Sequence, residues 1–108
     1  MSDISEVTPR SLADDAVVLD VREPYEFEAG HAPNAVCIPL GQLPVRLSEV
    51  PDETPLAVIC RVGVRSMTAA QFLSERGIEA VNVAGGIVAW FDAGKPLVSE
   101  NGEAPGVV

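Results

Sequence analysis

The chain has 108 residues, enough for one domain, and its hydrophobic content of 47% excludes a chain that is disordered throughout. Sixteen acidic against seven basic residues give a net charge of −9, which argues against a surface for nucleic acid or anionic membranes. The acidic N-terminal stretch lacks the apolar core of a signal peptide, and no run reaches the roughly 20 apolar residues of a transmembrane helix, so we expect a cytoplasmic protein.

In the first part of the chain, short helical patterns alternate with apolar runs that are typical of strands. A proline after a capping threonine predicts a short helix over residues 9–12. Residues 16–21 are rich in β-branched side chains and indicate a strand buried on both faces. A helix over residues 22–30 should follow, with Pro24 at its first position and Gly30 after its end.

The middle of the chain continues this alternation. Residues 35–38 predict a short strand, in which we interpret Cys37 as a small buried core residue. Pro44 is expected to open a helix through residue 48, and the polar stretch 51–55 to end it. Two cysteines without a secretory signal do not make a disulfide framework, and a single histidine without paired cysteines argues against a structural zinc site.

The second half holds the strand that we expect at the centre of the sheet. The apolar run 56–59 predicts this strand, the loop 60–65 follows it, and residues 66–76 predict a helix capped by Gly77. One face of that helix is small and packable, formed by Ser66, Ala69, Ala70 and Leu73. Residues 80–83 predict the last strand.

A Gly-Gly turn at residues 85–86 leads into a final helix over residues 87–91. Ile87, Trp90 and Phe91 are expected to share the face of this helix that meets the core. The two glycines either line the mouth of a pocket or allow tight packing of the turn.

Short strands alternating with short helices, without a hairpin pattern such as Asn-Gly, predict an α/β fold with a mostly parallel sheet. We expect residues 1–97 to form one domain and residues 98–108 a flexible acidic tail. In such sheets ligands bind beyond the carboxyl ends of the strands, where the strand order switches. Cys60 occupies that kind of position.

The thiol of Cys60 would lie at a helix N-terminus between Arg61 and Arg65, and both features lower the pKa of a thiol. The loop would point successive backbone N–H groups inward as an anion site, for which Gly63 supplies the conformational freedom. Arg65 could hold an anionic substrate by forked hydrogen bonds. The alternative is that Cys60 is merely buried at a strand end, beside two solvated arginines.

The chain resembles the single-domain rhodaneses, a family of sulfurtransferases. Four motifs carry the resemblance, keep the family's order and span about residues 5–97: Asp20–Phe27, Gly30–Ala35 with Ile38–Leu40, Cys60–Ser66 and Gly85–Trp90. The resemblance implies a small rhodanese-like domain, with a central sheet flanked by helices on both faces.

The resemblance also implies a persulfide mechanism. In rhodanese-like enzymes a cysteine takes the outer sulfur of thiosulfate or a persulfide, and a thiol or cyanide acceptor, or a protein, then removes that sulfur. Carried onto this sequence, Cys60 is the nucleophile, and no metal or organic cofactor is required. The loop that would bind the substrate comprises Arg61, Val62, Gly63, Val64 and Arg65.

Loop length separates sulfur transfer from phosphate chemistry. Related phosphatases and arsenate reductases place five residues between the cysteine and the arginine, whereas four residues, Arg61 to Val64, lie between Cys60 and Arg65. The smaller ring suits a sulfur atom better than a tetrahedral phosphate. Val62 and Val64 make the rim more apolar than is usual in the family.

Residues outside the loop are candidates for supporting roles. Asp20 and Arg22 follow a buried strand and either pair with each other or brace the loop, and Ser66 directly follows Arg65. His31 is a titratable group that could serve as a base, but we expect it to fix its own turn by a hydrogen bond.

Two other functional classes fit the same residues. Rhodanese-like domains also serve as non-catalytic interaction or regulatory modules. A redox-sensing thiol domain would instead trap Cys60 as a sulfenic acid or a mixed disulfide.

Overall fold

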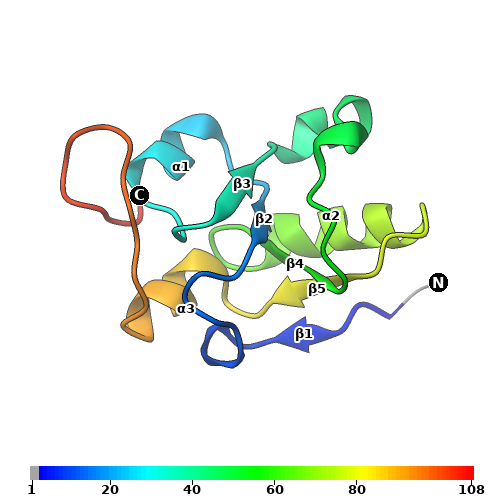
Figure 1. The fold of residues 1–108 in the computed structure, drawn as a ribbon, viewed down its shortest axis with the longest axis horizontal. Helices are drawn as coiled ribbons and strands as arrows, with labels where there is room; N and C mark the ends of the chain where they lie inside the picture. Colours follow the sequence, from blue (N-terminus) through cyan, green and yellow to red (C-terminus); the bar gives the residue numbers. More distant parts are fainter. Residues whose placement is uncertain (1–2) are drawn as a thin grey trace.

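Five short strands form one parallel sheet around which the chain is organised (Figure 1). The computed structural model of the protein describes residues 3–108. The strands are β1 (Glu6–Val7), β2 (Val18–Asp20), β3 (Ala35–Cys37), β4 (Leu56–Ile59) and β5 (Ala80–Val83). Their spatial order is β1-β5-β4-β2-β3, so the predicted α/β fold with a parallel sheet is confirmed.

The strand order switches direction between β2 and β4. From β2 the chain proceeds to β3 on one side of the sheet, and from β4 it proceeds to β5 on the other. The two strands are paired in register, with Asp20 opposite Ile59. The carboxyl ends of β2 and β4 therefore form the switch point where ligands bind in sheets of this kind.

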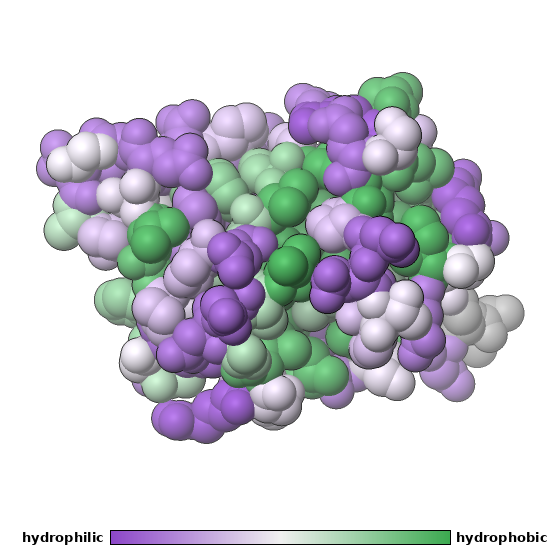
Figure 2. Space-filling view, in the orientation of Figure 1, coloured by the Kyte–Doolittle hydropathy of each residue, from purple (hydrophilic) through white to green (hydrophobic). Residues whose placement is uncertain are grey.

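Helices cover both faces of the sheet. They are η1 (Pro9–Ser11), α1 (Pro24–Ala29), η2 (Leu40–Val45), η3 (Leu47–Glu49), α2 (Val64–Ser74) and α3 (Gly86–Asp92), where η marks a 3-10 helix. Among the described residues, no helix combines the length and the apolar character needed to cross a membrane. Figure 2 shows apolar and hydrophilic residues interspersed over one face of the molecule.

Alternation along β4 divides the core in two. Leu56 and Val58 belong to the cluster that includes Ala69 and Leu73 of α2. Ala57 and Ile59 belong to the cluster that includes Ile87 and Trp90 of α3. Because side chains alternate along a strand, the next residue, Cys60, points to the α2 side, and it does belong to the α2 cluster.

The small face predicted for α2 is confirmed. Ser66, Ala69, Ala70 and Leu73 are all fully buried. The helix begins at Val64, two residues before its predicted start, because Gly63 in a left-handed conformation (φ 104°) turns the chain into it. The bounds of β4 and β5 agree with their predicted ranges.

Three predictions were wrong. Pro44 lies inside the 3-10 helix η2, which begins at Leu40, so it does not open a helix. Phe91 is 50% exposed, since the core-facing side of the short helix α3 is filled by Ile87 and Trp90. Cys37 is only half-buried, because β3 lies at an edge of the sheet.

The segment 98–108 returns along α1 (Figure 1). Val98 exchanges two backbone hydrogen bonds of 2.9 Å with His31, and the Gly106 N–H donates to the Ala29 carbonyl at 2.9 Å. Gly30 is required here for space, since a Cβ on it would lie 2.3 Å from the Gly106 carbonyl oxygen. The flexibility of this segment stays a prediction.

Trp90 provides a test of the packing beneath α3. Its side chain is fully buried and its Nε1–H donates to the Pro96 carbonyl at 2.9 Å. Trp90→Ala should lower the free energy of unfolding by about 3–5 kcal/mol, whereas Phe91→Ala on the same helix should change it by less than about 1 kcal/mol. Urea unfolding measures both, and equal losses would show that α3 packs differently.

Candidate active site

Cys60 directly follows β4, and its sulfur faces the start of α2. The side chain is 1% exposed. The backbone N–H of Gly63 donates to the sulfur at 3.1 Å, and the Ser66 hydroxyl oxygen lies 3.2 Å from it. The loop thus curls around the sulfur and points polar hydrogens at it, as an anion-binding loop does.

The turn between β5 and α3 holds this loop by hydrogen bonds to its backbone carbonyls. The N–H groups of Ile87 and Val88 donate to the carbonyls of Cys60 (2.8 Å) and Arg61 (3.1 Å). Gly86 has φ 60°, and a Cβ on it would lie 2.4 Å from the Cys60 carbonyl oxygen. Of the two roles expected for the Gly-Gly turn, the structure shows tight packing against the loop.

The surroundings of Cys60 favour its thiolate. Burial of the sulfur acts to raise its pKa. Hydrogen bonds from the Ser66 hydroxyl, in the orientation in which its proton faces the sulfur, and from the backbone N–H groups of Ser66, Gly63 and Val62 outweigh burial. The pKa of Cys60 is therefore lowered from its ordinary value, which is the condition for a reactive thiol.

Cys37 has the opposite character. Burial is the largest cause that raises the pKa of its thiol to about 11, and the charge of Asp20 adds to it. Its sulfur lies 3.7 Å from the Arg22 carbonyl oxygen. At neutral pH Cys37 is therefore a protonated thiol.

A buried network lies behind the loop. The Ser66 hydroxyl donates to Asn82 Oδ1 at 2.5 Å. Asn82 Nδ2 donates to the Gly63 carbonyl at 3.1 Å and to Glu6 Oε2 at 2.9 Å. Asn82 thus connects the loop around Cys60 to strands β5 and β1.

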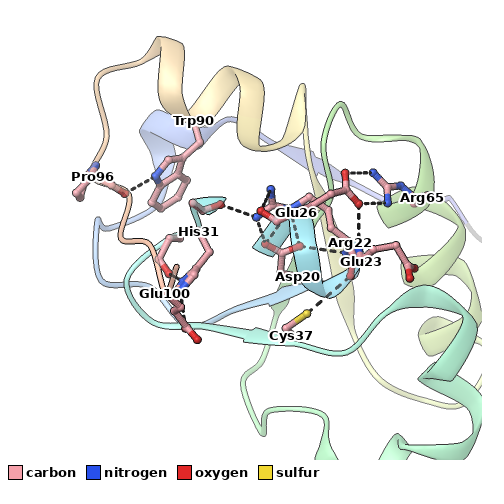
Figure 3. Close-up of polar contacts among 12 residues, drawn as sticks. Asp20, Arg22, Glu23, Glu26, His31, Cys37, Arg65, Trp90, Pro96 and Glu100 are labelled. Atoms are coloured by element: carbon pink, nitrogen blue, oxygen red, sulfur yellow. Dashed lines mark hydrogen bonds and ion pairs between the residues drawn. The ribbon is translucent and has the colours of Figure 1, made fainter. Parts of the chain in front are cut away.

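Arg65 makes a forked ion pair with Glu26 of α1 (Figure 3). Nη1 and Nη2 of Arg65 lie 2.8 and 3.0 Å from the two carboxylate oxygens. The hydrogen bond from Arg65 is the largest cause that holds the pKa of Glu26 below its ordinary value of 4.5. The fork that was expected to hold an anionic substrate is therefore engaged by a carboxylate of the protein.

Asp20 and Arg22 pair with each other, and both side chains are fully buried (Figure 3). Nε and Nη2 of Arg22 donate to the Asp20 carboxylate at 2.9 and 2.7 Å. Nη1 and Nη2 also donate to the carbonyls of Glu26 (3.2 Å) and Gly30 (2.9 Å). Arg22 therefore fixes the end of α1, which presents Glu26 to Arg65.

A surface pocket of about 490 Å³ lies elsewhere, at the opposite end of the sheet. Residues 47, 50–54 and 77–79, which precede β4 and β5, line it. The lining holds three carboxylates and no thiol, so the loop around Cys60 is the candidate active site instead.

Comparison with known proteins identifies the family. Residues 6–93, most of the chain, match the family described as "Rhodanese-like domain". The chain belongs to the rhodanese-like family.

Relatives of this rhodanese-like domain include proteins named as sulfurtransferases. The chain is 38% identical over 101 residues to a protein named "Sulfurtransferase" from Allochromatium vinosum, covering 91% of this chain and 94% of the relative. It is 32% identical to "Thiosulfate sulfurtransferase GlpE" of Pseudoalteromonas translucida, over 71% of this chain and 74% of that one. A rhodanese-related crystal structure from Thermoplasma volcanium has a TM-score of 0.79 and 35% identity, over 87% and 97% of the two chains.

The structure brings together the site residues predicted in the loop of the rhodanese-like domain but gives them different surroundings. Cys60 is buried, whereas Val62 and Val64 are 50% and 71% exposed on the rim. Arg61 is also exposed, and its Nε–H donates to the Val108 carbonyl at 3.0 Å. The roles of these residues toward a substrate stay predictions.

Two residues of the site were missed from the sequence. Glu26 lies in the helix predicted over residues 22–30 and received no role in the site, although it precedes Phe27, which packs inward. Asn82 is a polar residue in an otherwise apolar strand, and that contrast could have indicated a buried polar contact.

His31 fixes its own turn as expected, since its Nδ1 lies 2.8 Å from the Ala32 carbonyl and its Nε2 lies 2.8 Å from a Glu100 carboxylate oxygen.

The two cysteines should differ in reactivity. At pH 7 a limiting amount of iodoacetamide should alkylate Cys60 in strong preference to Cys37, because only the thiolate reacts and the pKa of Cys37 is raised to about 11. Peptide mass spectrometry identifies the modified residue. Equal labelling in the folded protein, with both sites labelled alike after denaturation as a control, would contradict this assignment.

The Glu26–Arg65 pair should stabilise the fold in a pH-dependent way. Because the pKa of Glu26 is lowered on folding, its contribution is present above its ordinary value of 4.5 and is lost as the pH falls through the folded value. Glu26→Gln should therefore lower the free energy of unfolding by about 1 kcal/mol at pH 7 and by less at pH 3. Urea unfolding at both values measures it, with Glu28→Gln, an exposed neighbour, as the control.

Proposed function

We propose that this rhodanese-like domain is a sulfurtransferase that carries sulfur as a persulfide on Cys60. One observation carries the proposal: the Cys60 sulfur lies inside a short loop whose hydrogen bonds stabilise an anion at that atom. A thiolate held in this way is a nucleophile, and the same N–H groups can receive the negative charge of a persulfide.

The first half-reaction loads the sulfur. The Cys60 thiolate attacks the outer sulfur of thiosulfate, forms an S–S bond with it, and the bond between the two sulfur atoms of thiosulfate breaks. Sulfite leaves with that electron pair, and the negative charge of the persulfide resides on its outer sulfur. The likeness to a protein named as a thiosulfate sulfurtransferase supports thiosulfate as the donor, and a persulfide donor follows the same chemistry.

The second half-reaction regenerates the thiolate. A cyanide ion, or the thiolate of a small molecule or of an acceptor protein, attacks the outer sulfur of the persulfide and takes it. The Cys60 thiolate leaves with the electrons of the S–S bond. The two half-reactions need no external oxidant or reductant. The N–H groups of the loop stabilise the negative charge on the Cys60 thiolate and on the persulfide.

The two arginines have different roles in this proposal. Arg65 is held by Glu26, so it orders the beginning of α2 and contributes a positive charge near the sulfur rather than a free fork. Arg61 is exposed on the rim and contributes charge where a dianionic donor would approach. Val62 and Val64 give the same rim an apolar part.

Mass spectrometry of the intact protein tests the proposal. After incubation with thiosulfate, the protein should gain the mass of one sulfur atom, and cyanide should remove it. Cys60→Ser should gain none, whereas Cys37→Ser should gain as much as the wild type. Mercaptopyruvate and glutathione persulfide are the further donors to try.

No gain of sulfur from any of the three donors would contradict sulfur transfer. A phenotype that survives Cys60→Ser would then favour a non-catalytic module. Faster reaction of Cys60 with peroxide than with sulfur donors would favour a redox-sensing thiol.

A further inference from the structure

Asn82 is fully buried, and every polar atom of its side chain has a partner. Nδ2 donates to the Gly63 carbonyl and to the carboxylate of Glu6, which lies opposite Asn82 in the pairing of β1 with β5. Oδ1 lies 2.5 Å from the Ser66 hydroxyl oxygen. Asn82 takes no part in the proposed reaction, so these contacts call for another explanation.

These contacts allow only one orientation of the amide. A carbonyl and a carboxylate accept hydrogen bonds and donate none, so the NH₂ group of Asn82 must face Gly63 and Glu6. Oδ1 then faces Ser66 and can only accept. The hydroxyl proton of Ser66 therefore points at Asn82.

Ser66 has one hydroxyl proton and two neighbours that could receive it. The Cys60 sulfur lies 3.2 Å from its oxygen, farther than Asn82 Oδ1 at 2.5 Å. While the proton points at Asn82, Ser66 presents a lone pair to the sulfur, so it accepts from a Cys60 thiol and does not stabilise a thiolate. Turning the hydroxyl to the sulfur would leave the buried Oδ1 of Asn82 without a donor, which is costly.

We propose that Asn82 is a positioning residue that holds the Ser66 hydroxyl proton away from the Cys60 sulfur. It thereby makes the free thiolate less stable relative to the sulfur-loaded state. In a persulfide the negative charge lies on the outer sulfur, and the inner sulfur no longer needs the proton of Ser66. The backbone N–H groups, whose protons cannot rotate away, stabilise the anion in both states. Only the statement about the sulfur-loaded state rests on the proposed function.

The pH dependence of alkylation at Cys60 tests this inference. The charged groups around the loop are Arg61, Arg65, Glu26 and Glu6, and the variants leave all four unchanged. Rates with iodoacetamide are measured in a Cys37→Ser background for the parent, Asn82→Leu, Ser66→Ala and the double variant. Circular dichroism and thermal unfolding establish that each variant is folded.

Asn82→Leu should raise the alkylation rate at pH 7 about fivefold to tenfold and move the midpoint of the pH profile down, because the freed hydroxyl turns to the sulfur. Ser66→Ala alone should stay within about twofold of the parent. Adding Asn82→Leu to Ser66→Ala should change nothing further, since no hydroxyl is left to turn.

Two results would overturn the inference. A large loss of rate in Ser66→Ala would mean that Ser66 already donates to the sulfur, and this variant decides the matter even if Asn82→Leu does not fold. An equal effect of Asn82→Leu with and without Ser66 would mean that Asn82 acts only by holding Gly63. Alkylation needs no sulfur donor, so failure here is distinct from failure of sulfur transfer.

Discussion

The buried pair of Arg22 and Asp20 is the interaction on which the geometry of this site depends. Two charges without exposure to water are costly to bury, and the cost is offset only because every polar partner is in place. Arg22 joins the end of β2 to the carbonyls of Glu26, within α1, and of Gly30, just after it. Glu26 in turn holds Arg65 at the start of α2, so the helix that follows the loop around Cys60 is positioned from the neighbouring strand.

The loop itself obtains its chemistry from backbone groups more than from side chains. The peptide N–H groups of residues 62, 63 and 66 lower the pKa of Cys60 and have fixed directions. Side chains add control: Ser66 has a proton that can rotate, and Asn82 determines where it points. This division explains how a thiol with 1% exposure can have a lowered pKa while one of its hydrogen-bond donors is held away from it.

Local patterns predicted the sheet, the position of Cys60 and the small face of α2, because each depends on a short run of residues whose periodicity survives packing. Pairing between distant residues could not be predicted in this way. The contact of Arg65 with Glu26 depends on how α1 docks beside α2, and nothing in either segment fixes that geometry. Pro44 was misassigned because proline suits a helix start equally well as a 3-10 turn.

To lengthen the anion-binding loop after Cys60, the turn at Gly86 would have to be redesigned first. The carbonyls of Cys60 and Arg61 lie so close to Gly86 that any side chain there would collide with them, and the N–H groups that follow Gly86 bind the same carbonyls. An inserted residue could extend the loop only toward solvent, away from the sulfur. Specificity for larger tetrahedral anions would therefore require two segments, distant in sequence, to be redesigned together.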